Sequence, residues 1–463
     1  MLIHSRLSEP MAQEKIAVIV LAAGMGTRMK SALPKVMHPV AGRPMVLHLL
    51  DTVSGLAPEK VVVVVGPGME MVEKAVAPHQ CVQQTDRLGT AHAVAQARAA
   101  LDGFGGTILI LYGDTPLITI ETLRSMLEVR RSAADPAVVV LGFEPAGGGD
   151  YGRLVLGPDG LERIVEVKDA TPEERAIPLC NSGVMAVDGK RLFALIDKVD
   201  NKNAKSEYYL TDIVGLARAE GRACGHVAGD EEEMLGVNSR SELAVAEAIV
   251  QRRLREAAMA GGATLVDPDS VYFAYDTKLG RDVFIEPNVV FSPGVSIGDN
   301  VEIRAFCHFA GVSVADNVII GPFARLRPGA EIGEGVHIGN FVEVKQAKVE
   351  AGAKINHLSY VGDAHVGAGA NVGAGTITCN YDGYNKHLTE IGAGAFIGSN
   401  TSLVAPVKIG DGAITGAGSV ITKSVSANAL AVARGSQMEL PGWGERFRAR
   451  QEEAKAAKLK SKE

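Results

Sequence analysis

A turn of small residues directly after an apolar run is the first part of the sequence that can do chemistry. Ile16–Leu21 leads into Ala22–Arg28, and Lys35 follows shortly after. Backbone N–H groups of such a turn can approach a phosphate closely, and the side chains of Arg28 and Lys35 can neutralise its charge. The pattern is neither the dinucleotide fingerprint, which needs Gly or Ala where Met29 stands, nor the P-loop, which needs Gly-Lys before Ser or Thr. The turn predicts a phosphate loop of another kind, with a plain tight turn as the alternative.

A carboxylate follows a second apolar run in the same manner. Thr107–Leu111 is followed by Tyr112, Gly113 and Asp114. At the carboxyl end of a parallel strand, where ligands of α/β sheets bind, an aspartate can hold Mg²⁺ against nucleotide phosphates. A lone Asp after a strand is more commonly a turn or helix-cap residue, so its position alone leaves both interpretations open.

Short β-branched runs alternate with helical patterns from residue 15 to about 238. The runs include Val61–Val65 and Val138–Leu141, and the helical segments include Pro44–Val53 and Ala91–Ala100. The runs are continuously apolar, which is typical of strands buried on both faces in a parallel sheet covered by helices. We predict a doubly wound, Rossmann-like α/β domain whose ligands bind at the carboxyl ends of its strands.

The pattern changes to a period of six from about Val283. Ile297, Ile303 and Phe309 belong to a series of aliphatic or Phe residues, many followed by Gly, that continues to Ile421. Six residues can form one flat side of a triangular coil with the aliphatic inside, and glycine suits its corners. Stacked coils share one core, so we predict a left-handed parallel β-helix. A passive scaffold is the alternative, although the interruption at Thr376–Glu390 favours a working face.

The remaining segments complete a predicted division into five parts. Ser241–Ala260 is rich in Ala, Glu and Arg and predicts one connecting helix that ends at Gly261-Gly262. Met11 opens MAQEKIAVIV directly before the first strand, so we expect an upstream extension before it. The predicted boundaries are 1–14 for the extension, 15–239 for the α/β domain, 240–262 for the linker helix, 263–443 for the β-helix and 444–463 for a charged, solvated tail.

Composition excludes several classes of protein. The 463 residues carry 47 Lys and Arg against 54 Asp and Glu, a net charge of −7 that gives no basic surface for nucleic acid. The five cysteines include no Cys-x-x-Cys pair, which argues against a zinc ribbon or a disulfide framework and favours a reducing cytosol. The apolar runs are too short to cross a bilayer. We expect a cytoplasmic protein without nucleic-acid or membrane partners.

The combination of motifs resembles a known family. LAAGMGTRM followed by LPKVMHPVAGRPM is similar to the signature of the sugar-1-phosphate nucleotidyltransferases, with Met25 in place of the Lys often found there. Residues 84–92 resemble the family's base-reading segment. Further segments appear in the family's order: Tyr151–Arg153, Ile164–Glu166, Asn181–Gly183, Glu207–Asp212 and Gly236–Asn238. With the hexapeptide repeats, residues 15 to 443 resemble the bacterial bifunctional N-acetylglucosamine-1-phosphate uridylyltransferases / glucosamine-1-phosphate N-acetyltransferases.

The resemblance implies that the α/β domain transfers uridylyl from UTP to N-acetylglucosamine 1-phosphate. It implies uridine contacts from Leu21, Ala22, Ala23, Gly24, Gln84, Gly89 and Thr90. Arg28 and Lys35 would lie near the phosphates, and Asp114 and Asn238 would share Mg²⁺. The amino sugar would be held by Tyr112, Gly113, Gly152, Glu166 and Asn181.

The same resemblance implies that the β-helix transfers acetyl from acetyl-coenzyme A to glucosamine 1-phosphate. His357 would be the base, because histidine ordinarily titrates near neutral pH. No argument from the residues alone selects it over the other ten of the 11 histidines. Glucosamine 1-phosphate would contact Arg327, Lys345, Tyr360, Asn371 and Lys386. Acetyl-coenzyme A would contact Ala374, Asn380, Tyr381, Ser399, Ala417 and Arg434.

The resemblance further implies a homotrimer and a place in cell-envelope synthesis, and two alternatives remain. One is a nucleotidyltransferase whose β-helix is not catalytic, which His357, Arg327 and Lys345 weigh against because a scaffold needs none of them. The other is a subunit of a regulatory complex. The phosphate loop and the Asp114/Asn238 pair weigh against that second alternative.

Overall fold

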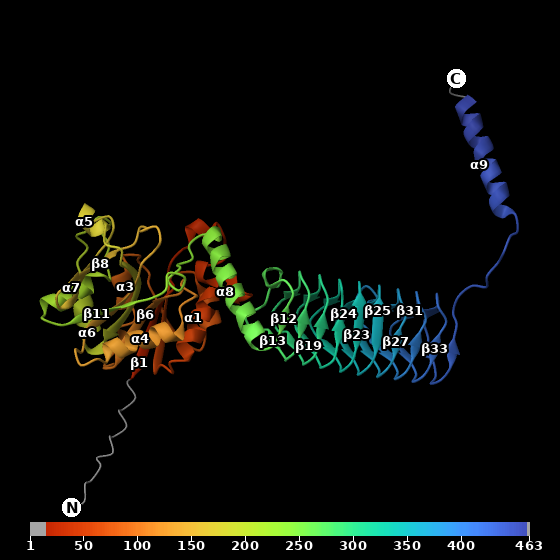
Figure 1. Ribbon diagram of the computed structural model, residues 1–463, viewed down its shortest axis with the longest axis horizontal. Helices are drawn as coiled ribbons and strands as arrows, with labels where there is room; N and C mark the ends of the chain where they lie inside the picture. The colour runs from red at the N-terminus through yellow and green to blue at the C-terminus, as the bar shows by residue number, and fades with distance from the viewer. Residues whose placement is uncertain (1–14, 461–463) are drawn as a thin grey trace, which may run out of the picture. The chain divides into compact units, whose positions relative to one another are not determined.

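The computed structural model of the protein describes residues 15–460, so the predicted extension 1–14 and residues 461–463 lie outside it. The described residues form two compact units (Figure 1). The first contains residues 15–260 together with Tyr272–Thr277, and the second contains 261–271 and 278–460. Gln251 ties Tyr272–Thr277 to the first unit, because its side chain exchanges two hydrogen bonds with the backbone of Phe273, at 2.6 and 2.8 Å.

The first unit is built on a mixed sheet. The parallel part pairs β1 (Ile16–Leu21) with β4 (Lys60–Val65) and β6 (Thr107–Tyr112). β10 (Cys180–Asp188) runs antiparallel to β6 and to β7 (Val138–Phe143), where we had predicted a parallel sheet. Apolar runs report burial on both faces but not strand direction. The full order is β11-β7-β10-β6-β1-β4-β5, with β5 at Gln80–Gln83, β11 at Cys224–Ala228, and a hairpin of β8 (Arg153–Gly157) and β9 (Gly160–Val165) beside β10.

Both faces of this sheet are buried, as predicted for a doubly wound domain. Along β1, Ala17 and Ile19 enter one core while Val18 and Val20 enter the other. One core is completed by α1 (Met45–Ser54), α2 (Glu70–Val76) and α4 (Ile120–Arg130). The other is completed by α3 (Thr90–Ala95), α6 (Gly189–Ile196) and α7 (Asp212–Ala219). Alternate side chains of one strand therefore anchor helices on opposite sides.

The predicted connecting helix is α8 (Arg240–Ala260), which belongs to the first unit. Ser239 Oγ accepts the backbone N–H of Glu242 at 3.3 Å, a side-chain cap of the first turn. Short elements complete this unit: η1 (Thr27–Met29), η2 (Lys35–Met37), β2 (Pro39–Val40), β3 (Arg43–Pro44), η3 (Ala99–Leu101) and α5 (Pro172–Arg175).

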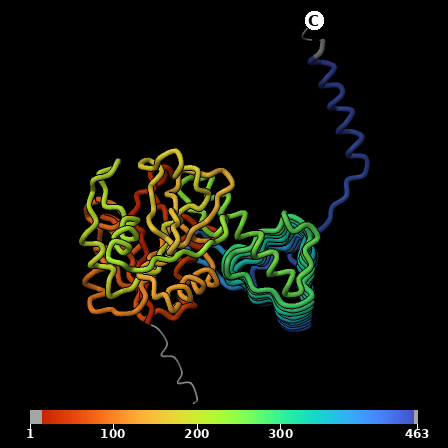
Figure 2. The backbone as a smooth tube through the Cα atoms, turned by 60° about the vertical axis from the view of Figure 1, so that its left-hand side comes forward, coloured from red at the N-terminus to blue at the C-terminus, as the bar shows by residue number. Residues whose placement is uncertain are grey.

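The second unit is a parallel β-helix whose coils have a triangular cross-section (Figure 2). One side is a ten-stranded parallel sheet: β12 (Thr264–Leu265), β14 (Phe284–Ile285), β17 (Glu302–Ile303), β20 (Ile319–Ile320), β23 (His337–Asn340), β25 (Lys354–His357), β27 (Asn371–Val372), β30 (Phe396–Ile397), β33 (Ile414–Thr415) and β35 (Leu430–Ala431). The handedness of the coil stays a prediction.

The other two sides form one sheet, because β24 (Glu343–Val349) and β26 (Tyr360–Val366) each continue around a corner and pair on both sides of it. One side contains β13 (Lys278–Leu279), β16 (Ser296–Ile297), β19 (Val312–Val314), β22 (Ala330–Ile332), β29 (Thr389–Ile391) and β32 (Val407–Ile409). The other contains β15 (Val290–Phe291), β18 (His308–Phe309), β21 (Arg325–Leu326), β28 (Ile377–Cys379), β31 (Ser402–Val404) and β34 (Val420–Ile421). The single turn η4 (Pro268–Ser270) and the helix α9 (Trp443–Lys460), in the predicted tail, complete the unit.

The hexapeptide aliphatics point inward as predicted, and the glycines of the coils are needed for two different reasons. Ile303 and Ile338 are fully buried. A Cβ on Gly339 would lie 1.7 Å from the backbone oxygen of Asn356 in the next coil, although Gly339 needs no positive φ. Close stacking of coils therefore requires glycine there. Left-handed backbone angles, the predicted reason, occur at other glycines of the coils, including Gly321 at φ 98°, and also at non-glycine residues such as Asn300 at φ 55°.

The interruption of the repeat is a loop on one coil. Tyr360 pairs with Ile377 in the next coil, whereas Ala364 pairs with Thr389, so extra residues are inserted between β28 and β29. This loop is shorter than the predicted interruption, because Ile377–Cys379 and Thr389–Ile391 remain within the stack.

Candidate active sites

A pocket of about 280 Å³ opens at the carboxyl ends of the central strands of the first unit. Its lining contains Leu21, Ala22, Ala23, Gly24, Lys35, Gln84, Gly89, Thr90, Tyr112 and Asp114, all of them predicted, together with Val36, Arg87, Ala93 and Glu207. Arg87 and Glu207 lie within segments that carried the family resemblance, so their charges were an available signal. Arg28, predicted near the phosphates, is exposed in η1 and is not among the lining residues.

The phosphate loop packs against Lys35. Gly26 has a φ of 62°, and a Cβ there would lie 2.5 Å from Lys35 Cβ, so glycine is required on both counts. A Cβ on Gly24 would lie 3.9 Å from Lys35 Nζ, which places the ammonium beside the loop. The backbone N–H of Gly113 donates to Leu21 O at 2.9 Å and joins the ends of β1 and β6.

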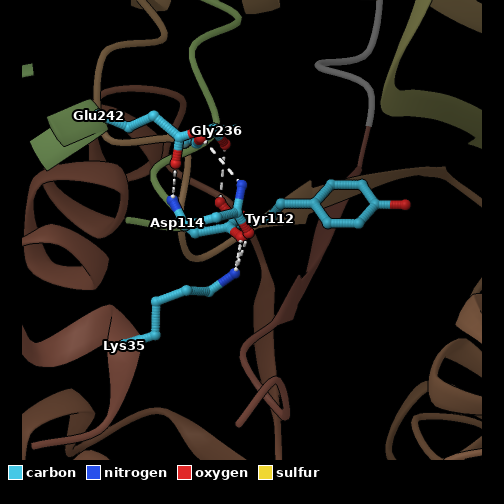
Figure 3. Close-up of polar contacts among 7 residues, drawn as sticks. Lys35, Tyr112, Asp114, Gly236 and Glu242 are labelled. Carbon is cyan, nitrogen blue, oxygen red and sulfur yellow. Dashed lines mark hydrogen bonds and ion pairs between the residues drawn. The ribbon is translucent and has the colours of Figure 1, made fainter. Parts of the chain in front are cut away.

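Two lining residues, Lys35 and Asp114, contact each other (Figure 3), and Lys35 also contacts Asn238, which is not among the lining residues. Lys35 Nζ donates to Asp114 Oδ2 and, over 2.9 Å, to Asn238 Oδ1. The Lys35 and Asp114 side chains are only 11% and 17% exposed. The residues themselves indicated Lys35 and Asp114, and the family resemblance added Asn238, but neither predicted that the ammonium bridges the two side-chain oxygens.

Three hydrogen bonds that involve residues 236–242 orient this cluster. Glu242 Oε2 accepts the backbone N–H of Asn238 at 2.7 Å, and Figure 3 shows Glu242 on the side of the cluster opposite Lys35. Asn238 Nδ2 donates to Gly236 O at 3.0 Å, which leaves the amide oxygen to face the Lys35 ammonium. Val237 N–H donates to Asp114 O at 2.9 Å. Sequence reasoning missed Glu242, whose signal was the capping pattern of Ser239 followed by Glu three residues later.

Gln84 is fixed by its amide nitrogen. Nε2 donates to Gly89 O at 3.2 Å and lies 3.2 Å from His92 Nδ1. Gly89 has a φ of 120°, and a Cβ on it would lie 2.4 Å from Tyr208 O, so the chain passes closely there. Thr90 Oγ1 accepts the backbone N–H of Leu210 at 3.0 Å.

The predicted amino-sugar residues lie together around Tyr112. Asn181 N–H donates to Gly152 O at 2.8 Å, and a Cβ on Gly152 would lie 3.5 Å from Glu166 Oε1. Asn181 Oδ1 accepts the N–H of Gly183, whose Cα faces the Tyr112 ring. Burial raises the pKa of Glu166, and the nearby Lys205 partly offsets that effect.

In the β-helix, His357 is exposed and has one defined side-chain partner. Asn340 Oδ1 lies 2.7 Å from His357 Nδ1, and the two residues are register neighbours in successive coils. The asparagine oxygen can only accept, so it holds the proton on Nδ1 and leaves Nε2 as an acceptor. Sequence reasoning missed Asn340, although the coil period places it directly beside His357.

Predicted acetyl-coenzyme A residues follow His357 in successive coils. His357 O accepts the N–H of Gly375, and Ala374 O accepts that of Asn400 at 2.7 Å. Ser399 O accepts the N–H of Gly418 in the following coil. Ala417 O accepts Nη1 of Arg434 at 2.7 Å. The four predicted residues Ala374, Ser399, Ala417 and Arg434 thus form one column along the stack, and His357 begins it.

A cationic group lies on the neighbouring side of the coils. Arg327 and Lys345 occupy adjacent coils, and a Cβ on Gly362, the register partner of Lys345, would lie 2.4 Å from Tyr360 Oη. The neighbouring Lys386 lowers the pKa of Lys345. Two ammonium groups side by side favour an anion between them. Asn371 is elsewhere, on the ten-stranded sheet beside Lys354 and Phe396.

The inserted loop is held by its own hydrogen bonds. Asp382 accepts the N–H groups of Tyr384 and Asn385 and pairs with His387, contacts that hold its pKa far below the usual range. Tyr381 is exposed, while Asn380 is buried and donates through Nδ2 to Asp363. The two predicted loop residues therefore face different surroundings.

Residues 15–460 contain neither a preformed metal cluster of His, Cys, Asp or Glu side chains nor a membrane-spanning helix. No group of three or more His, Cys, Asp or Glu side chains that could hold a metal occurs among these residues. Within the same range, every helix is too short or too polar to cross a membrane.

Comparisons with known proteins cover nearly the whole chain. Residues 18–176 match the MobA-like NTP transferase domain, and residues 276–311, 311–346 and 388–423 match the bacterial transferase hexapeptide of six repeats. Proteins named bifunctional protein GlmU are similar to it in Paramagnetospirillum magneticum (73% identity, 97% of this chain and 100% of the relative), Rhodospirillum rubrum (66%, 94% and 98%) and Sphingopyxis alaskensis (56%, 96% and 99%).

Proposed function

The chain belongs to the family of the bifunctional GlmU proteins, and from that premise we propose how its residues divide the synthesis of UDP-N-acetylglucosamine. The enzyme is both an N-acetyltransferase and a uridylyltransferase. Acetyl-coenzyme A and glucosamine 1-phosphate give N-acetylglucosamine 1-phosphate, which UTP converts to the nucleotide sugar. The contact of Lys35 with Asp114 and Asn238 carries the residue-level proposal for the uridylyl step.

In uridylyl transfer, a phosphate oxygen of N-acetylglucosamine 1-phosphate attacks the α-phosphorus of UTP. A new P–O bond forms, the bond to the bridging oxygen breaks, and pyrophosphate leaves. The N–H groups of residues 22–26 and the Lys35 ammonium stabilise the charge on the phosphates. Gln84 directs its amide nitrogen at Gly89 and His92. Its oxygen is then available to the N3–H of uracil, a donor that cytosine lacks.

Asp114 and Asn238 fit Mg²⁺. A carboxylate and an amide oxygen on either side of one cation are the hard ligands that Mg²⁺ takes, with nucleotide phosphates and water completing its shell. In this structure the Lys35 ammonium stands in as that cation. When bound, Mg²⁺ neutralises charge on the transferring phosphoryl and the leaving group.

For acetyl transfer, we assign the base to Nε2 of His357. It takes a proton from the ammonium of glucosamine 1-phosphate, and the amine then attacks the thioester carbon of acetyl-coenzyme A. The C–S bond breaks, and the leaving thiolate takes up the proton that the acylated nitrogen gives up. Arg327, Lys345 and Lys386 bind the sugar phosphate, and the column from Ala374 to Arg434 binds coenzyme A.

Several features of the whole protein remain part of the proposal. They are a homotrimer whose acetyl-transfer sites are shared between copies, a cytoplasmic location, a role in peptidoglycan precursor synthesis, and the five-part division given above. The five free cysteines support a reducing compartment.

The test is release of coenzyme A thiol from acetyl-coenzyme A, with and without glucosamine 1-phosphate and without UTP. We expect thiol release only with the sugar phosphate. A protein that transfers uridylyl but releases no thiol would support the alternative of a non-catalytic β-helix.

A further inference from the structure

We infer that Lys35 is a built-in counter-ion that occupies the metal site of the uridylyltransferase until metal and nucleotide arrive, and then moves to the phosphates. The inference rests on the magnesium site proposed above. It gives Lys35 a second role besides binding phosphate, namely control of metal access to the nucleotide-free enzyme.

The geometry of the cluster carries the inference. Lys35 Nζ donates to Asp114 Oδ2 and to Asn238 Oδ1, the two oxygens assigned to the metal. Asn238 Nδ2 is directed at Gly236 O, so the amide turns its oxygen toward the ammonium. The side chains of Lys35 and Asp114 are largely buried, and bulk solvent screens their charges poorly.

Mg²⁺ and the Lys35 ammonium cannot occupy this position at the same time. Mg²⁺ binds its oxygen ligands at about 2.0–2.1 Å, a distance that excludes an ammonium from the same oxygens and places two positive charges in contact. Metal entry therefore requires Lys35 to leave. Because the contact between the Lys35 ammonium and Asp114 must first be broken, the metal binds more weakly than it would bind to Asp114 and Asn238 without Lys35.

The phosphate loop gives Lys35 a destination. Its Nζ already lies beside Gly24, since a Cβ there would be 3.9 Å away. A rotation of the side chain within the same pocket exchanges the carboxylate for a nucleotide phosphate. Metal and nucleotide then favour each other's binding, because the nucleotide supplies the anion that accepts the displaced ammonium.

The experiment is a titration of the full-length protein with Mn²⁺ in the absence of nucleotide, at constant pH and ionic strength, with free Mn²⁺ read by electron paramagnetic resonance. We expect Lys35→Met to bind Mn²⁺ more tightly than the wild type, by a factor of about ten or more, because the competing charge is gone. Lys35→Arg keeps the charge and is the matched control, with no gain expected. Lys35→Gln is a second neutral variant. Its amide can still donate a hydrogen bond to Asp114, so it tests the role of the charge even if Lys35→Met folds poorly.

The outcomes separate this inference from the proposed site. Unchanged or weaker Mn²⁺ binding in the folded neutral variants would overturn the counter-ion role, since a lysine that only binds phosphate has no effect without nucleotide. Asp114→Asn should remove the tight Mn²⁺ site. If Asp114→Asn binds Mn²⁺ as the wild type does, the magnesium site itself is wrong.

Discussion

The two candidate sites are assembled in opposite ways. In the first unit, loops after separate strands converge, so Lys35 and Asp114 touch and are 11% and 17% exposed. In the β-helix, His357 is exposed and Arg327 retains 33% of its side-chain exposure. Parallel strands end at one edge of a sheet, whereas a repeat presents one residue per coil in a line. The first architecture buries a compact cluster in one chain, and the second distributes its groups over an outer surface.

That difference bears on assembly. A site on an outer surface leaves substrate groups uncovered unless another body covers them, and copies of one chain commonly supply such cover in symmetric oligomers. The openness of the His357 column therefore supports the proposed trimer. The cluster in the first unit is already largely buried within one chain, so the same argument does not call for a second copy there.

The largest expected effect separates the two sites completely. Asp114→Ala removes a proposed metal ligand and the partner of Lys35, so uridylyl transfer should fall by about 10³-fold or more. Acetyl transfer should keep its wild-type rate. Pyrophosphate release and thiol release measure the two reactions on one sample. Asp102→Ala, an exposed aspartate of the same unit, is the control. Loss of both activities in a folded Asp114→Ala protein would contradict the independence of the sites.

The converse change is His357→Ala. Removal of the proposed base should lower acetyl transfer by about 10²–10⁴-fold and leave uridylyl transfer intact. His365→Ala is the matched control. His365 lies in β26, the next strand along the chain, and pairs with Glu350 instead. Thiol release near the wild-type rate in His357→Ala would remove His357 from its role.

A smaller loss is expected from the group that positions this histidine. Asn340→Ala leaves Nδ1 of His357 without its acceptor, so the reactive tautomer is less favoured and kcat should fall about tenfold. The KM for acetyl-coenzyme A should stay constant. The split between kcat and KM is the decisive measurement, since a distorted coil would also weaken the binding of acetyl-coenzyme A. Asn340→Asp, which retains an acceptor, should recover most of the rate.

Glu242 is the corresponding positioning residue of the first site. Glu242→Ala frees the backbone of Asn238, and a misplaced ligand should lower uridylyl transfer several-fold to about tenfold. Glu242→Gln still offers an oxygen acceptor and should restore the rate. The dependence of the rate on Mg²⁺ concentration checks the mechanism: a general loss of stability would not shift it to higher metal.

Local, contiguous features of both sites were predictable from the sequence. The six-residue period follows from the residues themselves. The phosphate loop and Asp114 were candidates from neighbouring residues that the family resemblance favoured over plain turns, and His357 was selected only by that resemblance. The antiparallel direction of β10 depends on which segments meet in three dimensions, and hydrophobic patterns do not report that. Glu242 and Asn340 were missed although the capping pattern after Ser239 and the coil period pointed to them. Backbone freedom was predicted for the repeat glycines and applies at Gly321, whereas contact with the next coil, which requires glycine at position 339, was not predicted.

The smallest expected effect contrasts how the two units respond to pH. Burial, reinforced by Asp200, Glu166 and Asp169, raises the pKa of Asp212 in the first unit to about 6, whereas hydrogen bonds lower that of Asp382 in the β-helix loop. An aspartate with a raised folded-state pKa adds stability below its unfolded value of 3.8 and loses it as the pH rises through about 6. Above that pH the Asp212 carboxylate therefore costs stability.

Asp212→Asn should accordingly raise the melting temperature at pH 7.5, by roughly 2–4 °C if solvent screening of this half-buried group leaves about 1 kcal/mol of the cost. The gain should shrink at pH 5 and vanish near pH 4. Asp382→Asn should lower the melting temperature of the β-helix unit at pH 7.5, because its charged form is the one that the loop stabilises. Calorimetry at pH 7.5, 5 and 4 measures whether each variant raises or lowers the melting temperature. A gain for Asp212→Asn that is independent of pH would show that the carboxylate charge is not its cause.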